Sequence, residues 1–146
     1  MEGQEFLYQA VNELIGSEES ENTIQHLSRT SMIEPRKFPA VIIEDEPYNW
    51  NQEVGQNNII VRKQNFSLAV IIMSHNINDI TEDKYLADKN TLENLTKEIV
   101  SGILERVSTY DKIANLEFGT GEIFDGKISS VPVMWNMIPV KITLVN

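Results

Sequence analysis

Two histidines and one run of carboxylates are the side chains of this 146-residue chain whose types could serve catalysis or metal binding. A histidine acts as a base or a metal ligand when further ligands or an orienting carboxylate are brought to it. His26 and His75 are 49 positions apart, and both fall in segments without regular hydrophobic spacing. We therefore interpret each histidine as a surface or supporting residue.

The carboxylate run is Glu44-Asp45-Glu46, which follows a stretch of apolar residues. Neighbouring side chains of an extended segment point to opposite sides, so only Glu44 and Glu46 could converge on a cation. A divalent cation needs more oxygen ligands than these two, and the sequence indicates no third one. We favour a solvated strand end over a metal site at this position.

Other signatures of catalysis and cofactor binding are missing from the sequence. The chain has no cysteine, which excludes disulfides, thiolate metal sites and a thiol nucleophile. Gly119-Thr120-Gly121 lacks the Gly-Lys-Ser/Thr ending of a phosphate-binding loop, so it predicts a turn. No Gly-x-Ser-x-Gly elbow of a serine hydrolase occurs either. The sequence predicts no catalytic residue, no cofactor and no metal, and hence a protein that is not an enzyme.

The chain is strongly acidic, and its charge is uneven. It carries 22 Asp and Glu against 12 Lys and Arg, a net charge of −10. Residues 1–58 hold eleven acidic residues and only three basic ones, Arg29, Arg36 and Lys37. Such a surface repels phosphate and disfavours tight binding of DNA. Two interpretations stay open: the acidity serves solubility alone, or carboxylates line a channel that lets DNA pass without sticking.

Length and hydropathy bound the architecture. A chain of 146 residues suits a single domain. Its longest apolar run, Leu68–Met73, is far shorter than the ~20 residues of a membrane helix, so no membrane partner is expected. The first residues also lack the basic and apolar stretches of a secretion signal.

Hydrophobic spacing predicts the first elements. Leu7, Val11 and Leu14 lie one helical turn apart and predict a helix over Glu5–Ile15, followed by a solvated loop. Residues 23–37 show no clean period and predict an irregular segment. Alternating apolar residues predict strands over Phe38–Ile43 and 59–73.

The second half of the chain predicts one more helix and three strands. An apolar stripe predicts a helix over Thr91–Ser108, which either begins at Glu82 behind a Thr81 cap or breaks at 88–90. Residues 113–118 and 122–124 predict a hairpin around the Gly-Thr-Gly turn. Residues 131–145 predict a strand whose apolar positions change phase, which we interpret as a bulge or bend near Pro139, with Trp135 in the core. The result is one α+β domain, a mostly antiparallel sheet with two helices on one face.

The long strand over residues 59–73 has a further consequence. Fifteen extended residues would span about 50 Å, more than a typical strand, so its outer half should project as a hairpin arm around residues 45–64. An arm with apolar residues needs another subunit to pack on. We assign to one subunit interface the arm residues Tyr48, Trp50, Val54, Ile59 and Ile60. We assign the basic segment with Arg29, Arg36 and Lys37 to an acidic neighbour.

The order of elements, the stretch Phe38-Pro39-Ala40-Val41 that opens a strand and the ending Val140-Lys141-Ile142-Thr143-Leu144 resemble a known family. The chain is similar to the tail-terminator, or tail-completion, proteins of tailed bacteriophages, of the lambda-like type. It differs in a longer segment over residues 23–37 and an extended one over residues 48–64.

The resemblance implies a structural role without catalytic residues. A member of this family would form a homo-oligomeric ring, here a hexamer or dodecamer, between the head and the tail of the virion. It would contact portal, connector or tail proteins and surround passing DNA. Glu44, Asp45 and Glu46 are then candidates for an acidic lumen. The alternative is a small acidic immunity or inhibitor protein that blocks a basic partner, and an enzyme with an unrecognised site is a third reading.

Overall fold

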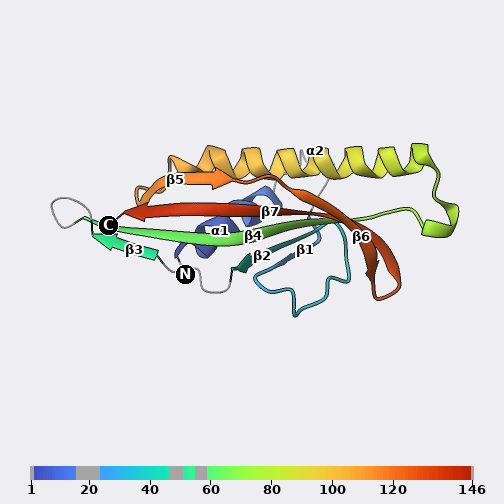
Figure 1. The fold of residues 1–146 in the computed structure, drawn as a ribbon, viewed down its shortest axis with the longest axis horizontal. Helices are drawn as coiled ribbons and strands as arrows, with labels where there is room; N and C mark the ends of the chain where they lie inside the picture. The colour runs from blue at the N-terminus through green and yellow to red at the C-terminus, as the bar shows by residue number, and fades with distance from the viewer. Residues whose placement is uncertain (1, 16–23, 47–50, 55–58, 146) are drawn as a thin grey trace.

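The described part of the chain is a seven-stranded sheet with two helices on one of its faces (Figure 1). The computed structural model describes residues 2–15, 24–46, 51–54 and 59–145. The elements are, in chain order, α1 (Glu2–Ile15), β1 (His26–Ser28), β2 (Ala40–Asp45), β3 (Asn51–Val54), β4 (Ile60–Met73), the 3₁₀ turn η2 (Ile77–Asp79), α2 (Glu82–Val107), β5 (Ile113–Phe118), β6 (Glu122–Ile128) and β7 (Val131–Val145).

Two long central strands organise the sheet. β4 and β7 pair antiparallel over the thirteen positions from Val61 to Met73. β2 and β3 pair with the other edge of β4, and β5 and β6 with the other edge of β7. Among the described strands, only β1 runs parallel to its neighbour, β2. The predicted α+β class, a mostly antiparallel sheet with two helices on one face, is therefore confirmed.

The helix α1 lies against the sheet through a stripe of buried residues, among them Phe6, Leu7, Ala10 and Val11. It begins at Glu2, three residues earlier than predicted. Its first turn approaches β4 so closely that a Cβ atom on Gly3 would lie 2.5 Å from Gln64 Oε1, which accepts a 3.1 Å hydrogen bond from the Gly3 amide. A side chain at this position would separate helix and strand.

The helix α2 is continuous over 26 residues, so the possible break at residues 88–90 does not occur. The Thr81 hydroxyl accepts a hydrogen bond from the Lys84 amide at 3.3 Å and caps its start, as predicted. The N-terminal part extends beyond the sheet (Figure 1). Neither described helix is long and apolar enough to cross a membrane. The buried stripe of α2 consists of Leu92, Leu95, Ile99 and Ile103.

The predicted bulge near Pro139 is wrong. The register of β7 against β4 is unbroken from Val133 to Val145, and Pro139 faces Ser67 within it. Even-numbered residues of β7 from 134 to 144 face the helices, whereas odd-numbered ones face the other side. The change of phase arises because both faces of this strand carry apolar residues. Those of the open face lie at odd positions in the first half of the strand, and most of those of the helix face lie at even positions in the second half.

The predicted hairpin between residues 113–118 and 122–124 is also wrong. β5 pairs with residues 140–144 of β7 and β6 with residues 131–137, so both follow the same edge of β7. At the step between them a Cβ atom on Gly121 would lie 2.3 Å from Asn136 Oδ1, so any other residue there would displace the buried Asn136 side chain. The tight turn is instead between β6 and β7, where Ser129 and Ser130 have φ values of 48° and 69°.

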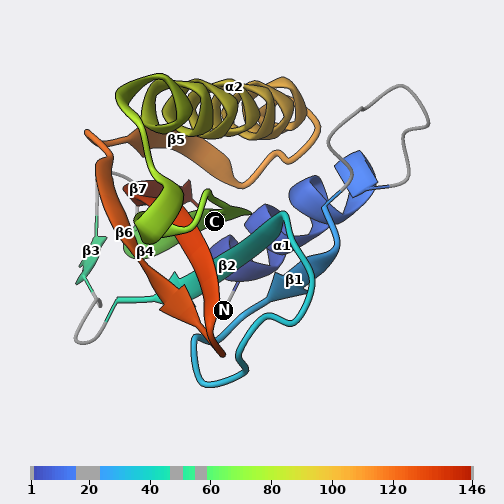
Figure 2. The same cartoon turned by 90° about the vertical axis from the view of Figure 1, so that its right-hand side faces the viewer.

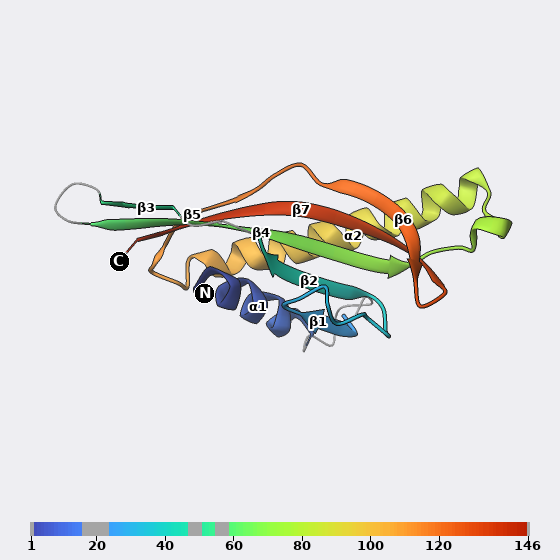
Figure 3. The same ribbon diagram turned by 60° about the horizontal axis from the view of Figure 1, so that its bottom comes forward.

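The predicted arm is present as the β3–β4 hairpin, which extends from one end of the sheet (Figure 3). β4 does not project alone, because β7 pairs with it as far as Val61. β2 and β3 use the same edge of β4, one after the other. The hairpin is therefore the end of the central sheet rather than a separate ribbon.

Candidate interaction surface

The sheet face opposite α1 and α2 is not covered by a described helix (Figure 2). One half of this face is apolar. We call this half the open apolar face. Ala40, Ile42, Ala69, Ile71 and Val133 form its buried centre. A groove of about 290 Å³ runs over it and is lined by Ile71, Trp135 and Met137 among others.

The rim of the open apolar face exposes large side chains. Met73 is 60% exposed, Phe124 40% and Met137 36%. Trp135 stacks on Phe124 with ring centroids 5.6 Å apart and an interplanar angle of 23°. Trp135, predicted to lie in the core, is only partly buried and belongs to this second face. The other half of the same face, towards the end of β7, is polar, with Asn65, Lys141 and Thr143.

The connection between β1 and β2, residues 29–39, forms one border of the groove. Residues 29–37 have the irregular conformation predicted for residues 23–37, but His26–Ser28 of the same segment form the strand β1, so that prediction is wrong there. Hydrogen bonds hold the connection: Thr30 Oγ1 accepts from the Met32 amide at 3.1 Å, and Glu34 accepts from Ser129 Oγ at 3.0 Å. Pro35 is buried. In contrast, Met32 is 91% exposed and Ile33 58%.

The three basic residues of the first half differ in their surroundings. Arg29 forms an ion pair with Glu5 at 2.7 Å and lies 3.9 Å from the centre of the Tyr8 ring, so its charge is already balanced within the chain. Arg36 and Lys37 are exposed, and no described residue forms an ion pair with either. These two remain available for a partner.

The three lumen candidates do not form one surface. Glu44 faces the open side of the sheet and accepts hydrogen bonds from the amide and the hydroxyl of Ser31, the latter at 3.2 Å. Asp45 pairs opposite Phe66 and therefore points to the opposite face, where it is exposed. Glu46 follows the strand and is exposed. Of the three, Asp45 and Glu46 have side chains without a hydrogen bond or ion pair to any described residue, although the Glu46 amide donates to the Asn65 carbonyl oxygen at 3.2 Å.

Part of the predicted arm interface lies outside the described residues, namely Tyr48 and Trp50. The backbone of Val54 pairs opposite Ile60 at the end of the β3–β4 hairpin. Ile59 is 44% exposed and Ile60 partly buried. The structure therefore places three of the five arm candidates together at one end of the sheet.

His75 has a partner that its sequence neighbours did not reveal. The buried Asp88 carboxylate, from the first part of α2, accepts hydrogen bonds from the His75 amide and from Nδ1, each at 2.9 Å. This pair fixes the segment after β4 to the helix, which agrees with a supporting role. The two residues are also part of the lining of a cleft of about 380 Å³ between α2 and the β6–β7 hairpin. His26 Nε2 is enclosed without a partner in the described chain.

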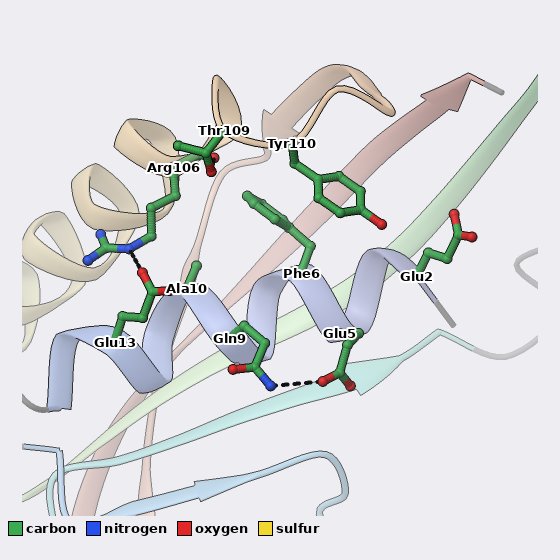
Figure 4. A pocket seen from close by; sticks show the side chains of 9 residues that line it. All are labelled: Glu2, Glu5, Phe6, Gln9, Ala10, Glu13, Arg106, Thr109 and Tyr110. Carbon is green, nitrogen blue, oxygen red and sulfur yellow. Dashed lines mark hydrogen bonds and ion pairs between the residues drawn. The ribbon is translucent and has the colours of Figure 1, made fainter.

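A further cleft of about 330 Å³ lies between α1 and the C-terminal end of α2 (Figure 4). Phe6 and Tyr110 line it with ring centroids 5.8 Å apart, and Glu2, Glu5 and Glu13 stand along α1. Every one of these carboxylates has a cationic partner. Glu2 pairs with Arg62 and Lys112, Glu5 with Arg29, and Glu13 with Arg106. The cleft is charge-balanced, and its ion pairs hold α1 to the rest of the fold.

Among the described residues no group of three or more His, Asp or Glu side chains is placed to hold a metal ion. No protein-family model matches the sequence, and no curated protein matches it.

Proposed function

We propose that this protein is a structural subunit of a tailed bacteriophage, forming a ring at the head–tail junction that joins neck or tail components and surrounds the DNA channel. The open apolar face carries the proposal, because it leaves Met73, Phe124 and Met137 exposed beside a groove. Contiguous exposed apolar surface of this kind is typical of protein interfaces. A protein whose task is assembly needs such a surface, whereas a freely diffusing one is selected against it.

The order of elements also supports the proposal. An N-terminal helix, a strand that includes Ala40 and Val41, a long central strand, a long helix and a C-terminal strand follow one another as in the tail-terminator resemblance. In this role the partners are further copies of the chain, in a hexamer or dodecamer, and portal, connector or tail proteins in the virion. Asp45 and Glu46 are the remaining candidates for a surface that repels DNA.

Oligomeric state tests the proposal. Native mass spectrometry of the purified chain should give one large defined oligomer, and negative-stain electron microscopy should show rings with a central opening. Met137→Lys puts a charge on the open apolar face and should weaken assembly, whereas Lys141→Ala, on the polar half of the same strand, should leave it unchanged. A chain that stays monomeric at its highest attainable concentration contradicts the ring.

The start of α2 favours a second candidate function, a small acidic inhibitor of a basic protein. Asp79, Glu82 and Asp83 are exposed there without an ion pair to any described residue, next to the exposed Tyr85. Charges of this kind accelerate the association of inhibitors with basic targets. This function requires a monomer or dimer in native mass spectrometry, so the same experiment separates the two.

A further inference from the structure

The loop over residues 32–37, which we call the basic loop, combines exposure with internal order. Ser31 is hydrogen-bonded to Glu44, Met32 to Thr30, and Glu34 to Ser129, so the first half of the loop is fixed to the rest of the fold. Fixing a loop in advance lowers the entropic cost of binding. What it holds in place is Met32, the most exposed large apolar side chain among the described residues.

The chemistry of the basic loop defines its partner. Met32 and Ile33 offer apolar area, and Arg36 and Lys37 stand beside them on the same cleft, which runs along the outer edge of β1. Neither cation is paired with a described residue. A complementary surface therefore presents exposed apolar side chains rimmed by unpaired carboxylates.

The start of α2, residues 79–86, is such a surface, and we call it the acidic helix end. Ile80, Tyr85 and Leu86 are exposed, with Leu86 at 53%. Asp79, Glu82 and Asp83 supply carboxylates around them that form no ion pair with a described residue. These three outnumber the one cation of the segment, Lys84, whose Nζ donates to the Asp79 carbonyl oxygen at 3.2 Å. The acidic helix end extends past the sheet and is free of covering elements in all three views (Figures 1, 2 and 3).

Two other surfaces fit the basic loop less well. The cleft between α1 and α2 has carboxylates, but every one of them is balanced by an arginine or lysine of the same chain (Figure 4). The open apolar face is bordered by the basic loop itself, through Glu34 and Pro35. If the basic loop of one copy bound the open apolar face of another, both patches would belong to one continuous surface. Such a contact favours a two-fold pair, in which both copies use the same surface, over a ring.

We propose that the basic loop of one copy binds the acidic helix end of a second copy of this chain. This inference rests on the proposed function and names the lateral contact of its ring. The two patches are separate surfaces, since Ser129 at the turn of the β6–β7 hairpin contacts the loop, whereas Asp125 within β6 lines the cleft beside the helix end. Each patch repels a copy of itself, so the contact is head-to-tail, and such contacts close into rings when the rotation permits.

Charge reversal tests the contact. Arg36→Glu/Lys37→Glu makes the basic loop acidic, and Asp79→Lys/Glu82→Lys makes the acidic helix end basic. Each double variant alone places like charges at every junction and should associate at least about tenfold more weakly than the unmodified chain. The control Lys97→Glu/Lys141→Glu changes the net charge as much at exposed positions elsewhere and should assemble normally. Circular dichroism verifies that each variant is folded.

Mixing the two double variants is the decisive step. Every junction in an alternating assembly then joins an acidic patch to a basic one, so a 1:1 mixture should restore oligomers that native mass spectrometry shows to contain equal numbers of both chains. If the unmodified chain assembles and neither variant differs from the control, this contact is wrong while the ring stands. A failed recovery in the mixture overturns it as well. An unmodified chain that never assembles refutes the ring and this contact together.

Discussion

The two faces of the sheet use the same strands but bury their side chains to different extents. On the covered face, Ile138, Val140, Ile142 and Leu144 of β7 are all less than 5% exposed beneath α1 and α2. On the open apolar face, Ala40 and Val133 are buried to that degree, Ile42, Ala69 and Ile71 are 5–7% exposed, and Met137 is 36% exposed. The covered face is therefore a fully buried core, whereas the open apolar face is only partly buried.

This difference separates folding from assembly. Burial of apolar area is the main favourable term in folding, and the covered face supplies most of it. The open apolar face retains apolar area that a further protein surface could bury. We therefore expect changes on the covered face to lower the free energy of unfolding, and changes on the open face to act on association.

The largest effect is expected from a pair of adjacent substitutions in β7. Ile138 and Met137 follow one another but face opposite sides, opposite Leu68 and Ala69 of β4. Ile138→Ala should lower the free energy of unfolding by about 2–5 kcal/mol, because it leaves a cavity in the covered core. Met137→Ala should lower it by about 1 kcal/mol or less, because its side chain is already partly in water. Urea denaturation of the dissociated chain measures both.

If both substitutions lowered the free energy of unfolding equally, the proposed difference between the two faces would be wrong, because the open face would then be as well packed as the covered one. The ratio matters more than either value, because both variants remove a chain of similar size from the same strand.

The alternation in β7 was visible in the sequence, but its meaning was not. Apolar residues at odd positions from Val131 to Met137 and at even positions from Ile138 to Leu144 suggested one buried face and a bulge. Periodicity reports which residues avoid water, not how many faces a strand buries, so two partly apolar faces and one bent strand give the same pattern. The pairing of β5 and β6 was hidden for a similar reason, because two short strands near a glycine turn pair with each other or with a third strand equally well.

The candidate surface was predictable only in part. The sequence predicted that Arg29, Arg36 and Lys37 would all be available to a partner, and this fits Arg36 and Lys37. Arg29 is instead paired with Glu5, which lies 24 residues away in the chain, so local spacing could not reveal the pair. The same applies to His75 and Asp88, which are 13 residues apart. Long-range pairs depend on topology, and topology does not follow from local spacing. Exposure of Met32 likewise required the structure.

Removing a hydrogen-bonding carboxylate from each side of the sheet should change the free energy of unfolding by an intermediate amount. On the covered side Asp88 is buried and accepts bonds from the amide and the ring of His75. Asp88→Ala leaves these donors without their acceptor and should lower the free energy of unfolding by about 1–3 kcal/mol. Glu44→Ala, which removes the contacts to the exposed Ser31 on the open side, should cost about 0.5–1 kcal/mol.

Asp88→Asn serves as the control, because it keeps an acceptor oxygen for the His75 amide and should recover part of the loss. A Glu44→Ala variant that is destabilised as strongly as Asp88→Ala would show that the β1–β2 connection belongs to the folding core. The distinction between the two faces would then have to be drawn elsewhere. Thermal and urea unfolding of the three variants give the order directly.

The smallest expected effect is on the pH dependence of stability, and it comes from Glu5, which links α1 on the covered face to the β1–β2 connection on the open face. Glu5 of α1 accepts a 2.9 Å hydrogen bond from the Gln9 side chain and pairs with Arg29, which begins the connection along the open face. The Gln9 hydrogen bond, followed by the Arg29 charge, holds the pKa of Glu5 below its ordinary value of 4.5. Because the pKa is depressed in the folded state, the stabilisation is present above that ordinary value and is lost as pH falls through the lowered pKa.

Glu5→Gln should therefore flatten the acid limb of the stability curve slightly and leave its neutral part nearly unchanged, since more than half of the side chain is exposed and water screens its charge. Urea denaturation from neutral pH down to about pH 3 follows the effect, with Glu98→Gln on the exposed side of α2 as the control. Both variants lose one carboxylate, so only the loss of the Gln9 and Arg29 contacts distinguishes them. If Glu5→Gln and Glu98→Gln gave identical acid limbs, the Glu5 contacts would contribute nothing to holding α1 beside the β1–β2 connection. The covered and open sides would then be energetically independent at the Glu5–Arg29 contact.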